Sequence, residues 1–216
     1  MSNSPPPVAD DTPSAGADPS APAAAAAALP VRAAGHTTPR PPAVAVKPRR
    51  LPGDRGKPPL LALTWSSFFG SGYFPLAPGT AGTAAAIPLW WLLRQDAVPT
   101  WAYLTATAAV TLTGIAAADR AGKYYGVADS GHIVIDEVAG YLITMAFLPR
   151  SAFAALAGFL LFRICDVLKP PPARFFDRDP RWKNGAGVVL DDVFAGIWAC
   201  ALTWAALWLR GRFFAT

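Results

Sequence analysis

The sequence has few of the side chains on which most soluble enzymes depend. Only 15% of its 216 residues are charged, and it contains two cysteines and two histidines. Cys165 and Cys200 form no CxxC pair, and both lie in apolar segments, where a free cysteine packs as a small hydrophobe. This pattern favours neither a disulfide nor a metal–thiolate site. Because Cys165 directly precedes Asp166, a nucleophilic role for this thiol stays open as an alternative to packing.

Apolar surface, by contrast, is abundant. Hydrophobic residues make up 53% of the chain, which includes 8 tryptophans, and the mean hydropathy is +0.30. These values are too high for an ordinary soluble domain and predict an integral membrane protein. The net charge of +5 does not indicate nucleic-acid binding, because the basic residues fall between apolar segments and form no basic helix. We expect membrane lipid, anionic lipid above all, as the partner.

The first 59 residues differ in composition from the rest. They are rich in proline and alanine and have few large apolar side chains, so they cannot bury enough surface to offset the entropy lost on ordering. We predict a disordered tail over residues 1–59 and a membrane-embedded domain over residues 60–216. The basic residues at the end of the tail favour a cytoplasmic location.

Six apolar segments follow the tail, at residues 60–69, 80–93, 101–118, 133–148, 151–164 and 188–209. A membrane-spanning helix needs about 20 residues, and several of these segments are shorter. The pattern predicts an all-α, multi-pass membrane bundle with four or five membrane helices. Residues 60–69 are interpreted as an interfacial or re-entrant piece, and Pro88 leaves the crossing of residues 80–93 open.

Three groups of carboxylates accompany these apolar segments: Asp136-Glu137, Asp166, and Asp191-Asp192. An acid in or near hydrocarbon costs several kcal/mol, about 2.5–3.5 by insertion measurements, so membrane acids usually face a protein-lined functional site. With the tail and the basic loops on the cytoplasmic side, all of these acids fall on that same face. Without accompanying Cys or His, carboxylate oxygens suit a hard cation such as Mg²⁺.

The two acid pairs lie in similar surroundings, Ile133-Val-Ile-Asp-Glu-Val-Ala-Gly140 and Val188-Val-Leu-Asp-Asp-Val-Phe-Ala-Gly196. We predict that each pair opens a helix, where the dipole favours carboxylates, and that each Ala-Gly step permits close helix approach. Adjacent helical residues point about 100° apart, so one acid of each pair is expected to face the site and the other to support it. Helix starts alone would explain each pair but not all three groups.

A turn that could hold phosphate precedes the second apolar segment. Pro78-Gly79-Thr80 leads into the helix expected over residues 80–93, with Thr80 available as a cap and free backbone amides suited to an anion. Lys169 adds a fixed ammonium. A cation, a helix start and an ammonium together commonly hold a phosphoryl group. His132 is the only histidine after residue 59, which excludes phosphatase chemistry that needs two histidines.

Four ordered motifs carry a family resemblance. They are Gly70-Ser-Gly72 with Pro75-x-x-Pro78-Gly-Thr80-x-Gly82-Thr83, then Ile133-Val-Ile-Asp-Glu-Val-Ala-Gly140, then Arg163-x-x-Asp166-x-x-Lys169-Pro-x-Pro172-x-Arg174-x-x-Asp177-Arg178, then Gly187-Val-x-x-Asp191-Asp192. Together they resemble the phosphatidylglycerophosphatase A family over nearly all of residues 60–209.

The resemblance implies a Mg²⁺-dependent enzyme of the bacterial inner membrane with its active site at the cytoplasmic face. Such enzymes remove the terminal phosphate of phosphatidylglycerophosphate during phospholipid biosynthesis. The alternatives are a phosphatase for phosphatidic acid or a polyprenyl phosphate, and a divalent-cation transporter. The catalytic set is expected to comprise Asp136, Glu137, Asp166, Lys169, Asp191 and Asp192. The metal ligands are expected to be Asp136, Glu137, Asp191 and Asp192, and the phosphate-binding residues Gly79, Thr80, Thr83, Lys169 and Arg174.

Overall fold

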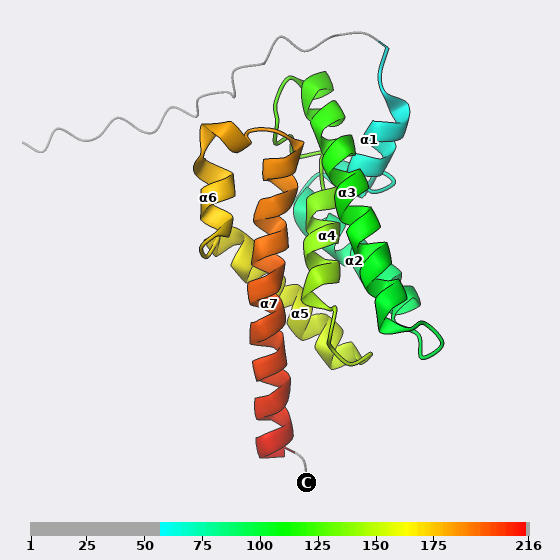
Figure 1. Cartoon of the computed structure of the whole chain (residues 1–216), viewed down its shortest axis with the longest axis vertical. Coiled ribbons are helices and arrows are strands. Elements are labelled where there is room, and N and C mark those ends of the chain that lie inside the picture. The colour runs from blue at the N-terminus through cyan, green and yellow to red at the C-terminus, as the bar shows by residue number, and fades with distance from the viewer. Residues whose placement is uncertain (1–56, 215–216) are drawn as a thin grey trace, which may run out of the picture. The chain divides into compact units, whose positions relative to one another are not determined.

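The computed structural model describes residues 57–214, and every regular element in that range is a helix (Figure 1). The all-α prediction is therefore confirmed for this part of the chain. Most of the predicted tail, residues 1–56, lies outside the described residues. The elements are α1 (Leu60–Ser66), the 3₁₀ helix η1 (Ser71–Tyr73), α2 (Pro78–Leu93), α3 (Thr100–Tyr125), α4 (Ile135–Thr144), α5 (Ala152–Leu168), α6 (Ala173–Arg178), the 3₁₀ helix η2 (Pro180–Trp182) and α7 (Gly185–Phe214).

Helix α4 forms the centre of the packing. Eight of its ten residues are buried, and it contacts α2, α3, α5 and α7 (Figure 1). Its sequence permits this because its side chains other than Asp136 and Glu137 are mostly apolar or small, so no face beyond the first turn needs solvent. The consequence is that the two acids of its first turn, Asp136 and Glu137, lie inside the bundle.

The Ala-Gly steps of the two similar segments meet where α4 crosses α7. A Cβ on Gly196 would overlap the carbonyl oxygen of Gly140, and a Cβ on Gly140 would overlap the ring of Phe162. Thr144 Oγ1 lies 2.9 Å from Gly140 O and 3.3 Å from Gly196 O. The predicted close approach at these glycines is confirmed, and it brings α4 and α7 near enough for their acids to meet.

Two helices, Thr100–Tyr125 and Gly185–Phe213, are long and apolar enough to cross a membrane. At 1.5 Å per residue, α3 is about 39 Å long and α7 about 45 Å. The ten-residue α4 is only about 15 Å long, against about 30 Å for the hydrocarbon core of a bilayer. Helix α2 contains Pro88 and α5 has 17 residues. Among the helices of residues 57–214, only α3 and α7 therefore pass as spans by length and composition.

Two helix starts differ from the sequence prediction. Helix α2 begins at Pro78 with Ala77 as its N-cap, so Thr80 lies in the first turn and is not the cap. Helix α7 begins at Gly185, where Asn184 Oδ1 accepts hydrogen bonds from the amides of Ala186 and Gly187. Asp191 and Asp192 therefore lie about two turns inside α7. The prediction that this pair opens a helix was wrong, because an earlier Asn supplies the cap.

Candidate active site

Three carboxylates converge between the first turn of α4 and the second turn of α7. Asp136, Glu137 and Asp192 each offer an oxygen, and these oxygens lie within 4.8 Å of one another. Asp136 and Asp192 are 7% and 4% exposed. The dipole of α4 stabilises the two acids at its start. It does not offset the repulsion among three buried carboxylates, so the cluster as a whole is short of positive charge.

The oxygen atoms of this cluster fit a hard cation. Asp136 Oδ1 and Glu137 Oε2 are buried and accept no hydrogen bond from any residue in the described range 57–214. A buried, unpaired carboxylate oxygen is costly, and a bound ion removes that cost. An all-oxygen set with no sulfur or imidazole suits Mg²⁺ or Ca²⁺ in preference to zinc. The predicted ligands Asp136, Glu137 and Asp192 are thus brought together.

Asp191, also predicted as a ligand, has a different partner. Its Oδ2 accepts a hydrogen bond of 2.6 Å from Lys169 Nζ, and its Oδ1 accepts one of 3.0 Å from the amide of Asp192. Lys169 Nζ also lies 2.9 Å from Asp177 Oδ1. Asp191 is therefore directed toward the ammonium and fixes its position beside the carboxylate cluster.

The two acids hold Lys169 in its charged form. Burial lowers the pKa of Lys169, but its hydrogen bonds to Asp191 and Asp177 outweigh burial and raise the pKa above the usual value. Burial in turn raises the pKa of Asp177, but the bond from Lys169 outweighs it and leaves that pKa lowered. Lys169 also has a left-handed backbone, with φ of 47°, a conformation that costs a non-glycine residue energy and recurs at functional sites.

The start of α2 lies directly against the carboxylates. A Cβ on Gly79 would overlap Glu137 Oε1 and lie 3.2 Å from Arg163 Nη2, so a larger residue there would displace the Glu137 carboxylate. Thr83 is buried, and its hydroxyl donates to Gly79 O at 3.0 Å, which holds this first turn in place. Because first-turn amides have no carbonyl one turn before them, those near Gly79 and Thr80 can donate to an anion.

Two predicted phosphate-binding side chains are engaged elsewhere. The Thr83 hydroxyl bonds within its own helix, and Arg174 is exposed, with Nη2 3.3 Å from Leu168 O. Arg163, which the site prediction left out, lies closer to the acids. Its Nη1 is 2.8 Å from Asp166 Oδ2 and 3.8 Å from Glu137 Oε1. Arg163 and Asp166 are three residues apart at the end of the apolar segment 151–164, and this i, i+3 spacing was the signal that could have identified it.

Three carboxylates that could hold a metal ion, the first turn of α2 and two basic side chains, Arg163 and Lys169, therefore lie close together. The family model described as "Phosphatidylglycerophosphatase A" matches residues 64–207. The chain belongs to this family. The match begins in α1 and ends in α7, so it includes every carboxylate of the cluster and both Arg163 and Lys169. As a member of the phosphatidylglycerophosphatase A family, the chain is a phosphatase.

Three curated relatives illustrate the range of the family. The chain is 40% identical over 130 residues to Phosphatidylglycerophosphatase A of Escherichia coli, covering 60% of this chain and 73% of the relative. It is 38% identical over 138 residues to the Haemophilus influenzae protein of the same name, covering 63% and 83%. It is 36% identical over 162 residues, covering 72% and 99%, to a Bacteroides thetaiotaomicron protein provisionally named phosphatidylinositol-3-phosphatase. No solved structure matches the chain significantly.

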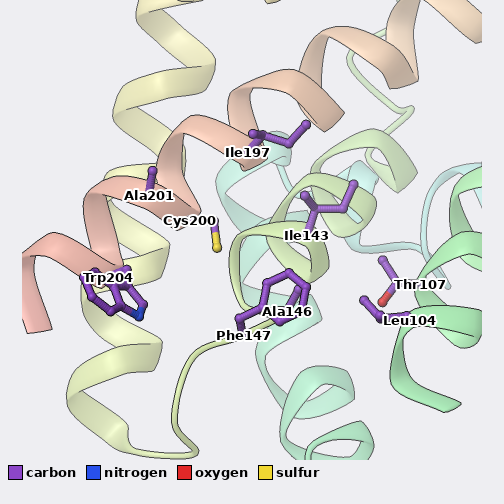
Figure 2. Close-up of a pocket in the computed structure, with 9 residues that line it drawn as sticks. All are labelled: Leu104, Thr107, Ile143, Ala146, Phe147, Ile197, Cys200, Ala201 and Trp204. Carbon is purple, nitrogen blue, oxygen red and sulfur yellow. The ribbon is translucent and has the colours of Figure 1, made fainter. Parts of the chain in front are cut away.

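An apolar pocket of about 490 Å³ lies between α3, α4 and α7 (Figure 2). Leu104, Ile143, Ile197 and Trp204 are among its lining residues, and none of them can bind metal or transfer a proton. Cys200 also lines it as a free thiol. Within the described residues, the groups suited to the chemistry of a phosphatidylglycerophosphatase A enzyme are those of the carboxylate cluster.

Proposed function

We propose that the chain is a Mg²⁺-dependent lipid phosphatase that hydrolyses phosphatidylglycerophosphate to phosphatidylglycerol and phosphate in phospholipid biosynthesis. Family membership and the names of two relatives support the substrate. The observation that carries the site is the convergence of Asp136, Glu137 and Asp192 on one point beside Gly79. Two of their oxygens are buried without a hydrogen bond in the described range, which is the state that a cation would relieve.

Asp136, Glu137 and Asp192 would hold the ion. A bound Mg²⁺ supplies charge to polarise the phosphate and lowers the pKa of a coordinated water. The first-turn amides at Gly79 and Thr80 would bind the phosphate oxygens, and the Lys169 ammonium would offset the charge that develops on them. Asp191 positions that ammonium. Arg163 balances the charge of Glu137 and Asp166, and Asp166 is the acid placed to serve as a further ligand or a base.

We further propose that the protein is multi-pass in the bacterial inner membrane, with the site at the cytoplasmic face. Helices α3 and α7 would cross, and α2, α5 and the segment around α4 would complete four or five crossings. The end opposite the acids supports a second membrane interface there. Arg150 lies 4.7 Å over Trp91 and Arg210 4.4 Å over Phe153, and such aromatic and basic belts are typical of a membrane–water interface.

Other lipid phosphates are alternative substrates for the same site. The provisional name of the Bacteroides relative favours a phosphatidylinositol phosphate as the second candidate, and phosphatidic acid and polyprenyl phosphates also carry a terminal phosphate. A divalent-cation transporter would place acids through the depth of the membrane. Here the carboxylates gather at one level, near the starts of α2 and α4, which favours headgroup chemistry.

The deciding experiment measures phosphate release by the purified protein in detergent, with Mg²⁺ and with EDTA. The substrates are phosphatidylglycerophosphate, phosphatidylinositol 3-phosphate, phosphatidic acid and a polyprenyl phosphate. We expect metal-dependent release chiefly from phosphatidylglycerophosphate. If the protein prefers another of these lipids, the proposed substrate is wrong and the proposed site still stands. If folded, Mg²⁺-loaded protein releases no phosphate from any of them, the proposed function is overturned.

A further inference from the structure

A second apolar groove lies between α2 and α5. Its volume is about 390 Å³, and its walls are Ala84, Ile87 and Trp91 from α2 and Ala152, Ala155, Leu156 and Phe159 from α5. No wall residue is charged. Ala84, Trp91 and Leu156 are exposed, so the groove opens to the outside of the bundle, and its size is that of a ligand site.

This groove begins one helical turn from the candidate phosphate site. On α2, Ala84 follows Thr80 by one helical turn, and on α5, Phe159 precedes Arg163 by one turn. Thr80 adjoins Gly79, and Arg163 Nη2 lies near Gly79 as well. The same two helices therefore border the candidate headgroup site at one end and line the groove beyond it. From Ala84 to Trp91 the groove follows α2 for about 10 Å.

At the far end of the groove, a cation lies over an aromatic ring. The Arg150 guanidinium lies 4.7 Å from the centre of the Trp91 ring, and this is the end that belongs to the proposed membrane interface opposite the acids. A chain that starts at the phosphate site would thus pass from polar side chains into an apolar groove, and a phospholipid has the same order of environments from its headgroup to its acyl chain.

We propose that the α2–α5 groove binds an acyl chain of the lipid whose terminal phosphate lies at the start of α2. This inference rests on the proposed function for the headgroup, and it adds the site that positions the rest of the substrate. Because lipid tails are as apolar as the groove, burial there adds little affinity. Its effect is orientation, which fixes the phosphate against the carboxylates and Lys169.

The pocket of Figure 2 is the internal control. It is also apolar and somewhat larger, but its walls come from α3, α4 and α7 and include no residue of α2 or α5. Gly79 and Arg163, which border the candidate phosphate site, are not among its lining residues. A lipid there would touch no lining residue of α2 or α5, the two helices that form the proposed groove. Filling the two sites with the same side chain therefore separates the proposed groove from a general effect on lipid packing.

The test compares Ala84→Phe with Ala201→Phe, two exposed alanines in the two sites. We measure kcat/KM for dioleoyl and dihexanoyl phosphatidylglycerophosphate. We expect Ala84→Phe to lower the long-chain to short-chain ratio about tenfold, because a displaced chain misplaces the phosphate, and Ala201→Phe to leave that ratio within about twofold. An unchanged ratio in Ala84→Phe, or a fall in Ala201→Phe, would overturn the inference.

A second measurement does not depend on turnover or on a variant. The wild-type protein in EDTA is irradiated with a phosphatidylglycerophosphate that carries a diazirine near the end of one acyl chain, and the labelled peptides are mapped. We expect labelling of residues 84–91 and 152–159 that excess unlabelled phosphatidylglycerophosphate suppresses and phosphatidylcholine does not. Labelling spread evenly over exposed helix faces would show bulk lipid, and labelling confined to 104–107 and 197–204 would show the other pocket. Either result overturns the inference even if hydrolysis is never observed.

Discussion

Asp136-Glu137 and Asp191-Asp192 stand in similar sequence surroundings, yet the structure gives them different partners. Both acids of the first pair enter the three-carboxylate cluster, from the first turn of α4. Of the second pair, Asp192 enters the cluster, whereas Asp191 accepts a hydrogen bond from Lys169. One segment thus supplies two carboxylates to the cluster, and the other supplies one carboxylate to the cluster and one to Lys169.

The difference follows from helix register and from the neighbours that each pair meets. Adjacent residues point about 100° apart, so two acids share a site only where the site wraps around the helix. At α4 it does, because α7 approaches one side and the start of α2 the other. On α7 the face that carries Asp191 meets the end of α5, where Lys169 lies.

The largest expected effect comes from removing one carboxylate of the cluster. Asp192→Asn should lower phosphate release at least about a thousandfold, because loss of a direct ligand removes several kcal/mol of stabilisation. Melting temperature should no longer rise with Mg²⁺. Without Mg²⁺ the variant should melt no lower than the wild type, since the change removes a repelled charge. Near-normal turnover would refute the assignment of Asp192.

Asp191→Asn should have a smaller effect of a different kind. We expect kcat to fall about 10- to 100-fold, as is usual for a residue that orients a functional group. The Mg²⁺ concentration for half-maximal activity should stay the same, because Asp191 does not belong to the cluster. Asp177→Asn is the matched control, since it removes the other partner of Lys169 and should reduce kcat less. A shift in Mg²⁺ requirement as large as that of Asp192→Asn would make Asp191 a ligand.

Much of this site follows from residue types alone. Acids beside apolar segments predicted a polar centre, and the absence of sulfur and imidazole predicted a hard cation; Asp136, Glu137 and Asp192 do converge. The expectation that one acid of each pair faces the site holds for Asp191-Asp192 and was wrong for Asp136-Glu137. That outcome depends on three helices meeting at one point, which periodicity along a single segment does not contain.

The helix starts were less predictable. The Pro78-Gly79-Thr80 turn does lead into a helix, but Pro78 occupies the first helical position, as proline often does, and this moves Thr80 inside the first turn. In α7 the apolar pattern begins at Val188, whereas Asn184 caps the helix one turn earlier. The shorter lengths of α2, α4 and α5 also depend on packing, because apolar composition alone does not distinguish a buried core helix from a span.

The smallest expected effect on chemistry comes from the crossing that holds the two acid pairs together. Gly196→Ala places a Cβ against the backbone of Gly140, and such overpacking costs about 1–3 kcal/mol. We expect a lower melting temperature and a weaker response to Mg²⁺, because α7 must move away from α4 and carry Asp192 with it. Gly211→Ala is the control in the same helix, since a Cβ there meets no atom within 4 Å and alanine favours helix. If both variants have the same melting temperature, close approach at Gly196 does not set the spacing of the carboxylate cluster. If only Gly196→Ala weakens the response to Mg²⁺, the crossing of α4 and α7 holds the carboxylates of the two helices at the distance that the ion requires.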